Sequence, residues 1–279
     1  MNTIKLVLLL SSLAGILMII GYFVAGKVGV TIAFVLSVVL NFGSYWYSDQ
    51  LVLKMAGAQE VSEASAPQLY DTVRDLAEKA KLPVPRVYIM QQDSPNAFAT
   101  GRNPEHAAVA VTTGIMKILS KDELSGVIAH ELSHIQNRDT LIGTVAATMA
   151  GTVVMVATVA RWGAVFGLGE DGGRTVGLIA TAIVAPIAAT LIQMAISRSR
   201  EYLADESGAR MSGKPEALAG ALAKLARGVQ VKPMDANPST AHLFIVNPFS
   251  GSAVMNLFST HPPIEKRIER LMKMKLKES

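Results

Sequence analysis

The chain contains no cysteine, few charged residues and few aromatic residues. Of its 279 residues, 17% are charged and 6% aromatic, whereas 50% are hydrophobic. The absence of cysteine excludes disulfide bonds and thiolate metal sites, so any zinc site must use nitrogen and oxygen ligands. A chain this apolar is unusual for a soluble enzyme, and its composition favours a membrane protein.

Four long apolar runs predict membrane-spanning helices. They cover residues 6–26, 28–47, 141–160 and 175–196, and each is close to the roughly 20 residues that cross a bilayer. A cleaved signal peptide is the alternative for the first run, but a second run follows it at once after a turn at Gly26-Lys27. For the last two runs, the alternative is a pair of buried core helices.

These runs divide the chain into four parts. We predict an amino-terminal transmembrane hairpin at 1–47, a soluble part at 48–139, a second transmembrane hairpin at 140–196 and a second soluble part at 197–279. Tyr45, Trp46 and Tyr47 suit an interfacial aromatic belt at the end of the first hairpin.

Basic residues near the ends of the runs predict the orientation. One side of the membrane would carry five of them and the other side three, which places both soluble parts in the cytoplasm. A net charge of +4 therefore indicates the lipid bilayer as a partner rather than nucleic acid. The two sets are Lys5, Lys54, Arg138, Arg198 and Arg200, and Lys27, Arg161 and Arg174.

The soluble parts predict an α+β fold that is mainly helical, with a small β-sheet. Helical spacing of apolar residues marks residues 66–80, and three short strands follow at 85–90, 96–101 and 106–113. Ser120 and Glu123 form a capping-box sequence that begins another helix. Further helices are expected around 199–213, from 214, and after a Pro-Pro pair near the carboxyl end.

The sequence HELSH, from His130 to His134, lies on the helix that this capping box begins. Residues four apart share one helical face, so His130 and His134 can bind one metal ion. Glu131 can then act as general base on a water, which is the zincin arrangement of a metallopeptidase. An isolated motif of this kind also occurs on ordinary helices with exposed polar residues, so its surroundings decide the interpretation.

Catalytic zinc requires a third protein ligand and an open position. The sequence SRSREYLAD offers Glu201 and Asp205, four residues apart on one predicted helix. A hairpin of two spans would return Glu201 to the face that carries His134. Asp205 would then orient a ligand histidine through its other ring nitrogen. The alternative is that Glu201 forms a surface ion pair with Arg198 or Arg200.

HELSH, the paired apolar runs, EYLAD and STHPPIEKRIERL together resemble the HtpX-type membrane zinc metallopeptidases, relatives of the CAAX prenyl proteases. The resemblance covers essentially the whole chain. It implies a zincin-like catalytic domain on the cytoplasmic face of the bacterial inner membrane, with one Zn²⁺ per subunit. It also implies that the enzyme cleaves misfolded or damaged membrane proteins. His130, His134 and Glu201 would be zinc ligands, Glu131 the base and Asp205 a supporting carboxylate.

The same resemblance implies catalytic roles for His261 and Arg267, which would approach the attacking water or the oxyanion. A positively charged donor at a tetrahedral intermediate has a clear physical use. The alternative is a histidine at a helix start and a surface arginine. His106 and His242 are expected to be structural or exposed to solvent.

The strand at 96–101 suggests how substrate binds. An exposed sheet edge can receive an extended peptide as an added strand, which reads the backbone and tolerates varied side chains. We therefore predict that Asn96 and Ala97 contact substrate.

Two rival functions remain at this point. One is a membrane scaffold or transporter with a structural metal, although a transporter should carry ionisable groups within its spans, and these runs contain almost none. The other is a zinc enzyme that acts on a lipid-modified peptide.

Overall fold

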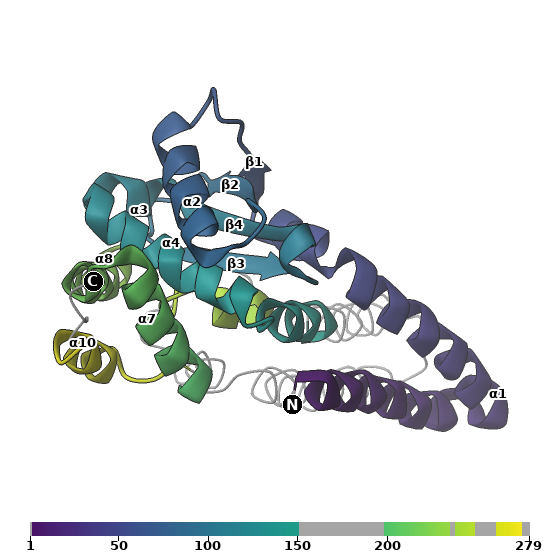
Figure 1. Cartoon of the computed structure of the whole chain (residues 1–279). Helices are drawn as coiled ribbons and strands as arrows, with labels where there is room; N and C mark the ends of the chain where they lie inside the picture. Colours follow the sequence, from purple (N-terminus) through teal and green to yellow (C-terminus); the bar gives the residue numbers. More distant parts are fainter. Residues whose placement is uncertain (1, 151–197, 235–237, 249–260, 275–279) are drawn as a thin grey trace.

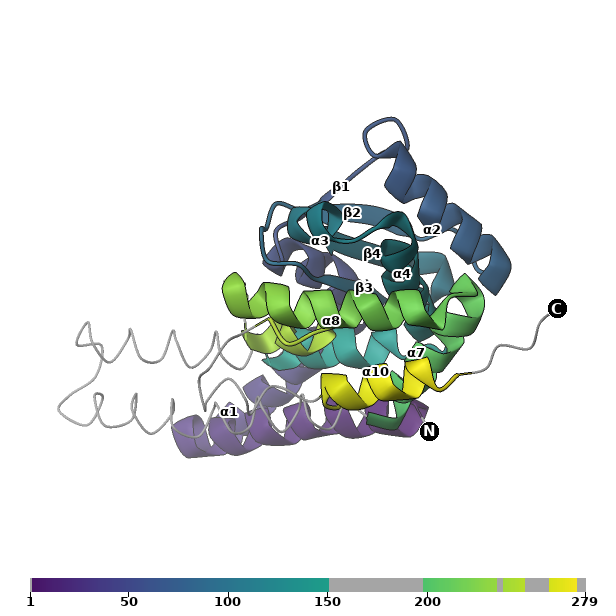
Figure 2. The same cartoon turned by 90° about the vertical axis from the view of Figure 1, so that its left-hand side faces the viewer.

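The computed structural model describes residues 2–150, 198–234, 238–248 and 261–274. Figures 1 and 2 show a layered part, built from a small sheet and several helices, with a long helical hairpin projecting from it. The predicted third and fourth apolar runs lie mostly at 151–197, outside the described residues.

The first helix, α1 (Asn2–Met55), forms the projecting hairpin. The helix is folded into two arms (Figure 1). Gly26 has a φ of 57°, in the left-handed region that glycine adopts without strain, which places the turn there. The Asn41 side chain on the second arm donates a hydrogen bond of 3.2 Å to the Leu10 carbonyl on the first. The expected turn is thus confirmed, but the helix runs past residue 47 to Met55.

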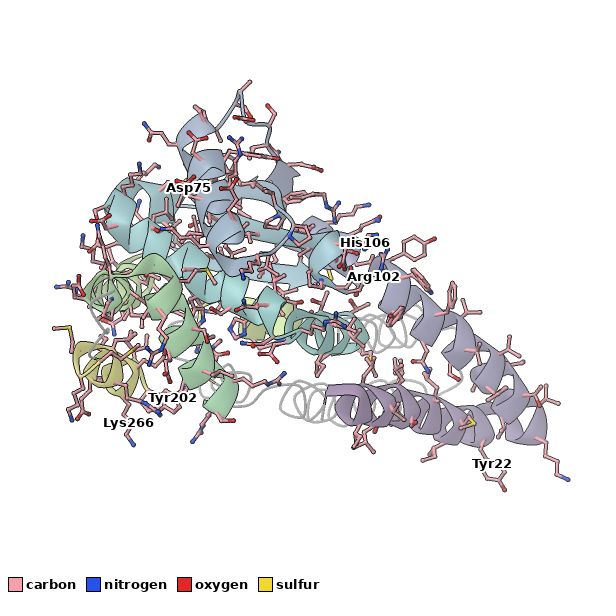
Figure 3. The ribbon with its side chains drawn as sticks, in the orientation of Figure 1. Tyr22, Asp75, Arg102, His106, Tyr202 and Lys266 are labelled. Atoms are coloured by element: carbon pink, nitrogen blue, oxygen red, sulfur yellow. The ribbon has the colours of Figure 1, made fainter. Side chains whose placement is uncertain are left out.

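Among the described residues, one helical stretch, Gly26–Met55, is long and apolar enough to cross a membrane. Two shorter apolar helices, Leu6–Ile19 and Thr140–Ala150, accompany it. Four spans are therefore not established. The Arg102 guanidinium lies over the Trp46 ring, 4.9 Å from its centroid, at the end of the sheet near α1 (Figure 3).

The sheet has four strands in the order β1-β2-β4-β3 and is mixed. Parallel pairing joins β2 (Arg86–Met90) to β4 (Ala107–Thr112), and antiparallel pairing joins β4 to β3 (Ala97–Gly101). The three predicted strands are confirmed. The short β1 (Ala58–Glu60), antiparallel to β2, was not predicted, because three residues carry too little alternation to recognise.

Both faces of this sheet are covered. Side chains alternate between the faces: Val87, Ala99 and Val109 belong to the core formed with α2 and α4, whereas Tyr88 and Phe98 belong to the core formed with the end of α1. This double burial explains why β3 and β4 are buried at every position.

Helices α2 (Pro67–Ala80) and α4 (Lys121–Gln136) pack on the first of these faces. Helix α2 presents Leu69, Val73 and Leu76 to the core, as its spacing predicts. Ser120 caps α4, and Glu123 completes the reciprocal capping box, so the predicted start of this helix is confirmed. A short helix, α3 (Thr113–Ile118), joins β4 to α4.

The carboxyl-terminal helices close the layer around α4. They are α7 (Arg198–Ser212), α8 (Pro215–Val231) and α10 (Ile264–Met272), with the 3₁₀ turn η2 (Pro238–Leu243) between the last two. Helix α7 approaches α4 at Gly208, where an added Cβ would lie 2.7 Å from the backbone nitrogen of His130. Only glycine permits backbone contact this close. The predicted α+β, mainly helical fold class is confirmed.

Candidate metal centre

The HELSH segment occupies the buried side of α4. His130 is 1% exposed and Glu131 is 2% exposed. The rings of His130 and His134 lie 4.9 Å apart at nearly right angles. One helical turn separates them, so both imidazoles point to the same place, as the i,i+4 spacing requires.

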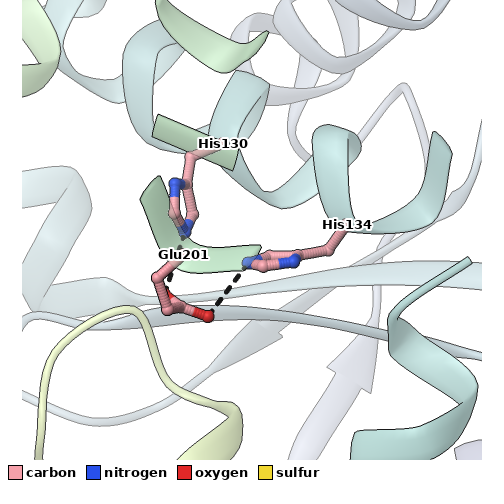
Figure 4. Close-up of side chains that lie close together, drawn as sticks. All are labelled: His130, His134 and Glu201. Atoms are coloured by element: carbon pink, nitrogen blue, oxygen red, sulfur yellow. Dashed lines mark ion pairs between the residues drawn. The ribbon is translucent and has the colours of Figure 1, made fainter. Parts of the chain in front are cut away.

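Helix α7 brings Glu201 to these histidines (Figure 4). The Glu201 carboxylate oxygens lie 3.8 Å from His130 Nε2 and 3.5 Å from His134 Nε2. One ligand atom from each residue lies within 4.8 Å of the others. The backbone contact at Gly208 fixes this spacing, because it sets the distance between α7 and α4.

These three residues fit a catalytic zinc ion. Tetrahedral bonds of about 2.0–2.2 Å place neighbouring donor atoms about 3.3–3.6 Å apart. The distances between Glu201 and the two histidines are close to that range. Two imidazole nitrogens and one carboxylate, with a further position left for water, match the donor set of a catalytic zinc site.

Glu131 lies against the edge strand, where the backbone of Ala99 hydrogen-bonds its carboxylate. Burial raises the pKa of Glu131 to about 7, although the neighbouring His134 opposes this effect. Its Oε1 atom is buried without a hydrogen-bond partner among the described residues. A carboxylate with a pKa near neutrality and a free oxygen suits proton exchange with water.

A second carboxylate lies behind His130. Asp205 Oδ1 is 3.0 Å from His130 Nδ1, so the imidazole presents its Nε2 to Glu201. The guanidinium of Arg267 donates two hydrogen bonds to Asp205, of 2.8 and 2.7 Å. Burial opposes ionisation of Asp205, but Arg267 and His130 lower its pKa to about 2.

His261 and Arg267 meet the site from different directions. His261 Nδ1 lies 2.9 Å from Glu201 Oε2 and borders the same cleft. Burial works against the charge on Glu201, yet His261 and His134 hold the Glu201 pKa well below its ordinary value. Arg267 is fully buried and also donates to the Ile245 carbonyl. Both catalytic assignments stay predictions.

Three residues at the cleft were not assigned to the metal site from the sequence. Asp139 and Arg200 form an ion pair of 3.1 Å, and Asp139 lies 3.5 Å from His134 Nδ1. His242 lines the cleft, 95% buried, with Nε2 donating to the Gly143 carbonyl at 3.0 Å. No motif spacing marks these residues. His106, by contrast, is exposed and bonds Asn103 on the turn before β4 (Figure 3).

Asn96 and Ala97 contact a segment of the same chain. Ile245 donates its backbone N–H to the Ala97 carbonyl at 3.0 Å, and Asn96 Nδ2 donates to the Val246 carbonyl at 2.9 Å. Asn96 is fully buried. Their contact with substrate stays a prediction.

This fold and site define an HExxH metallopeptidase, with two histidines on one helix and a glutamate on a second. The chain belongs to the family described as Peptidase family M48, whose sequence model matches residues 63–275. Three similar relatives are each named "Protease HtpX homolog". The relative from Desulforapulum autotrophicum is 56% identical over 97% of this chain and 89% of its own. The relative from Syntrophobacter fumaroxidans is 58% identical over 95% of this chain and 97% of its own. The relative from Thermococcus kodakarensis is 58% identical over 95% of this chain and 93% of its own.

A solved structure, Ste24p of S. mikatae, is similar in fold, with a TM-score of 0.50 and 16% sequence identity. The match covers 97% of this chain but 65% of that one. The family model and the three relatives confirm the resemblance to HtpX-type metallopeptidases, and the chain is a metalloprotease of this family with a membrane-helix candidate.

Proposed function

We propose that this protein is a zinc-dependent endopeptidase that cleaves misfolded or damaged membrane proteins at the cytoplasmic face of the cell membrane. The observation that carries the proposal is the convergence of His130, His134 and Glu201 on one point, with Glu131 beside it in the same cleft. The cleft is small, with a cavity volume of about 60 Å³.

His130 and His134 would hold the metal through Nε2, and Glu201 through its carboxylate. A bound zinc ion supplies Lewis acidity, which polarises a water and the scissile carbonyl. Glu131 accepts the proton of the attacking water and delivers it to the leaving amine. Its buried position in the cleft and its unpartnered Oε1 atom among the described residues support both steps, because one group must accept and then donate the same proton.

The edge of β3 supports an extended substrate, but over a short stretch. In an antiparallel pair, alternate residues direct their backbone groups away from the partner strand. On β3 these are Ala97, Ala99 and Gly101. Ile245 already donates to the Ala97 carbonyl, and Thr140 Oγ1 donates to the Gly101 carbonyl at 2.9 Å. Ala99 lines the cleft, and its N–H already bonds the Glu131 carboxylate. We therefore assign the main backbone contact with substrate to the Ala99 carbonyl, with Asn96 and Ala97 further along the edge.

The proximity of apolar helices supports delivery of substrate from the bilayer. The helix Thr140–Ala150 begins immediately after Asp139, and Thr140 and Gly143 line the cleft. The second arm of α1 packs against the sheet through Val52 and Leu53. Four transmembrane helices, with both soluble parts cytoplasmic, are the topology that we propose from the charge distribution.

The test is cleavage of an unfolded membrane protein in detergent, with metal removed by a chelator and then restored as zinc. Cleavage should stop on chelation and return with zinc. Glu131→Gln should retain zinc but lose cleavage, because an amide cannot accept the proton. His130→Ala should lose both. Cleavage by the Glu131→Gln protein would refute the mechanism, and zinc retention without any cleavage by the wild type would favour a structural metal in a scaffold.

A further inference from the structure

Both ligand histidines have a carboxylate behind the nitrogen that faces away from Glu201. For His130 this carboxylate is Asp205, which Arg267 holds. For His134 it is Asp139, whose Oδ2 lies 3.5 Å from His134 Nδ1. Arg200 holds Asp139 through Nη1 at 3.1 Å. The site therefore contains two similar series of side-chain contacts, each running from a histidine to an aspartate to an arginine.

The geometry at His134 has a specific cause in the backbone. Helix α4 ends at Gln136, and Arg138 adopts a left-handed φ of 56°. This turn brings the backbone of Asp139 back to the helix, where its N–H donates to the His134 carbonyl at 2.9 Å. The Asp139 side chain, 8% exposed, consequently lies beside the His134 ring.

The His134 ring needs such support more than the His130 ring does. The His134 side chain is 16% exposed, compared with 1% for His130. Packing alone thus leaves it more rotational freedom. A neutral imidazole carries one proton on either nitrogen, and a carboxylate at Nδ1 selects the form whose Nε2 is free to bind a metal.

The pair also joins two distant points of the chain. Asp139 and Arg200 are 61 residues apart. Asp139 directly precedes the predicted second transmembrane hairpin, residues 140–196, and Arg200 follows it near the start of α7. The ion pair thus connects the two ends of this apolar segment to a metal ligand.

We propose that Asp139 and Arg200 are positioning residues, which fix His134 for metal binding and link the metal centre to the ends of the apolar segment at 140–196. This inference rests on the proposed zinc site, and it goes beyond the ligands and the base. Neither residue contacts the reacting atoms. Their effect is on the orientation of His134, so it should appear in metal affinity and in kcat rather than in KM.

The test compares the full-length proteins Asp139→Asn and Arg200→Gln with the double variant. Zinc affinity is measured by competition with a chromophoric chelator, and ligand geometry by the visible absorption of the cobalt-substituted protein. Asp139→Asn should lower zinc affinity about 10- to 100-fold, the effect expected for a group that orients a ligand histidine. Arg200→Gln should lower it less, and the double variant should resemble Asp139→Asn. Arg200→Lys should recover most of the loss.

Asp122→Asn and Arg210→Gln are matched controls, since each removes one partner of an exposed ion pair away from the cleft. Both should keep the wild-type zinc affinity and cobalt spectrum. Unfolding temperatures of the metal-free proteins distinguish an effect on the stability of the fold from an effect on metal binding. Lower unfolding temperatures with unchanged zinc affinity, or independent additive effects of the two substitutions, would overturn the inference. A wild-type protein that binds no zinc would overturn the proposed function as well.

Discussion

Replacing Glu131 by glutamine should stabilise the metal-free protein while it abolishes cleavage. Burial raises the pKa of this carboxyl from 4.5 to about 7. The difference corresponds to about 3 kcal/mol against the folded state above pH 7, since one pKa unit is worth about 1.4 kcal/mol. Glutamine carries no charge but leaves a buried amide without full hydrogen bonding, which costs about 1–2 kcal/mol.

The expected net gain is therefore about 1–2 kcal/mol at pH 8, or about 2–6 °C in unfolding temperature for a chain of this size. The gain must depend on pH. A carboxyl with a raised pKa stabilises the folded state fully below pH 4.5, and this contribution is lost as the pH rises through about 7. The advantage of the variant should accordingly shrink by about 2 kcal/mol between pH 8 and pH 5.

The assay is thermal unfolding in detergent, followed by tryptophan fluorescence after metal removal with a chelator. Glu216→Gln, an exposed position on α8, is the matched control and should unfold like the wild type at both pH values. In the zinc-loaded protein the cation stabilises the Glu131 carboxylate, so the gain should diminish. A Glu131→Gln protein that unfolds below the wild type at pH 8, or a gain that does not vary with pH, would refute this reasoning.

Further predictions follow from the contacts around the site. Gly208→Ala places a Cβ 2.7 Å from the backbone nitrogen of His130 and should lower both the unfolding temperature and the zinc affinity. Gly213→Ala places a Cβ that meets no atom within 4 Å and should leave the zinc affinity unchanged. Arg267→Met leaves Asp205 buried without its cation and should cost about 3–5 kcal/mol of stability, measured by thermal unfolding; an unchanged unfolding temperature would contradict the pairing. Ser120→Ala removes the α4 cap and should cost about 1 kcal/mol in the same measurement without altering zinc affinity. N-methylation of a cleaved peptide, one residue at a time, removes one backbone N–H donor in each variant. One position should lose most of the kcat/KM, because Ala99 is the edge residue that lines the cleft. Alternating losses over many residues would contradict this.

The parts of the site that were predictable from sequence share a short-range cause. Ser120 and Glu123 mark the start of α4, and the i,i+4 spacing then places His130 and His134 on one face. The strands follow from apolar runs bounded by proline, asparagine and glycine. Each of these signals depends on neighbours within one or two turns of the chain, where geometry is nearly independent of the rest of the fold.

The parts that were not predictable depend on long-range packing. Asp139 reaches His134 because Arg138 adopts a left-handed conformation. An arginine in the sequence does not predict this conformation. The backbone contact at Gly208 appears in the sequence only as a glycine within a predicted helix. His242 enters the cleft from a turn whose place is set by Gly143, on a helix about 100 residues earlier. Glu201 was predictable in spite of its distance because catalytic zinc demanded a third ligand.

The three residues that would bind the metal are held in place to different degrees. His130 is held by the α4–α7 backbone contact at Gly208 and by the buried pair of Asp205 and Arg267. His134 is the most exposed donor, and its support comes from residues that flank the predicted apolar hairpin. A change at the ends of that segment should therefore disturb His134 more than His130. If substrate arrives from the bilayer as we propose, its contact with that segment should affect the metal ligands first at His134.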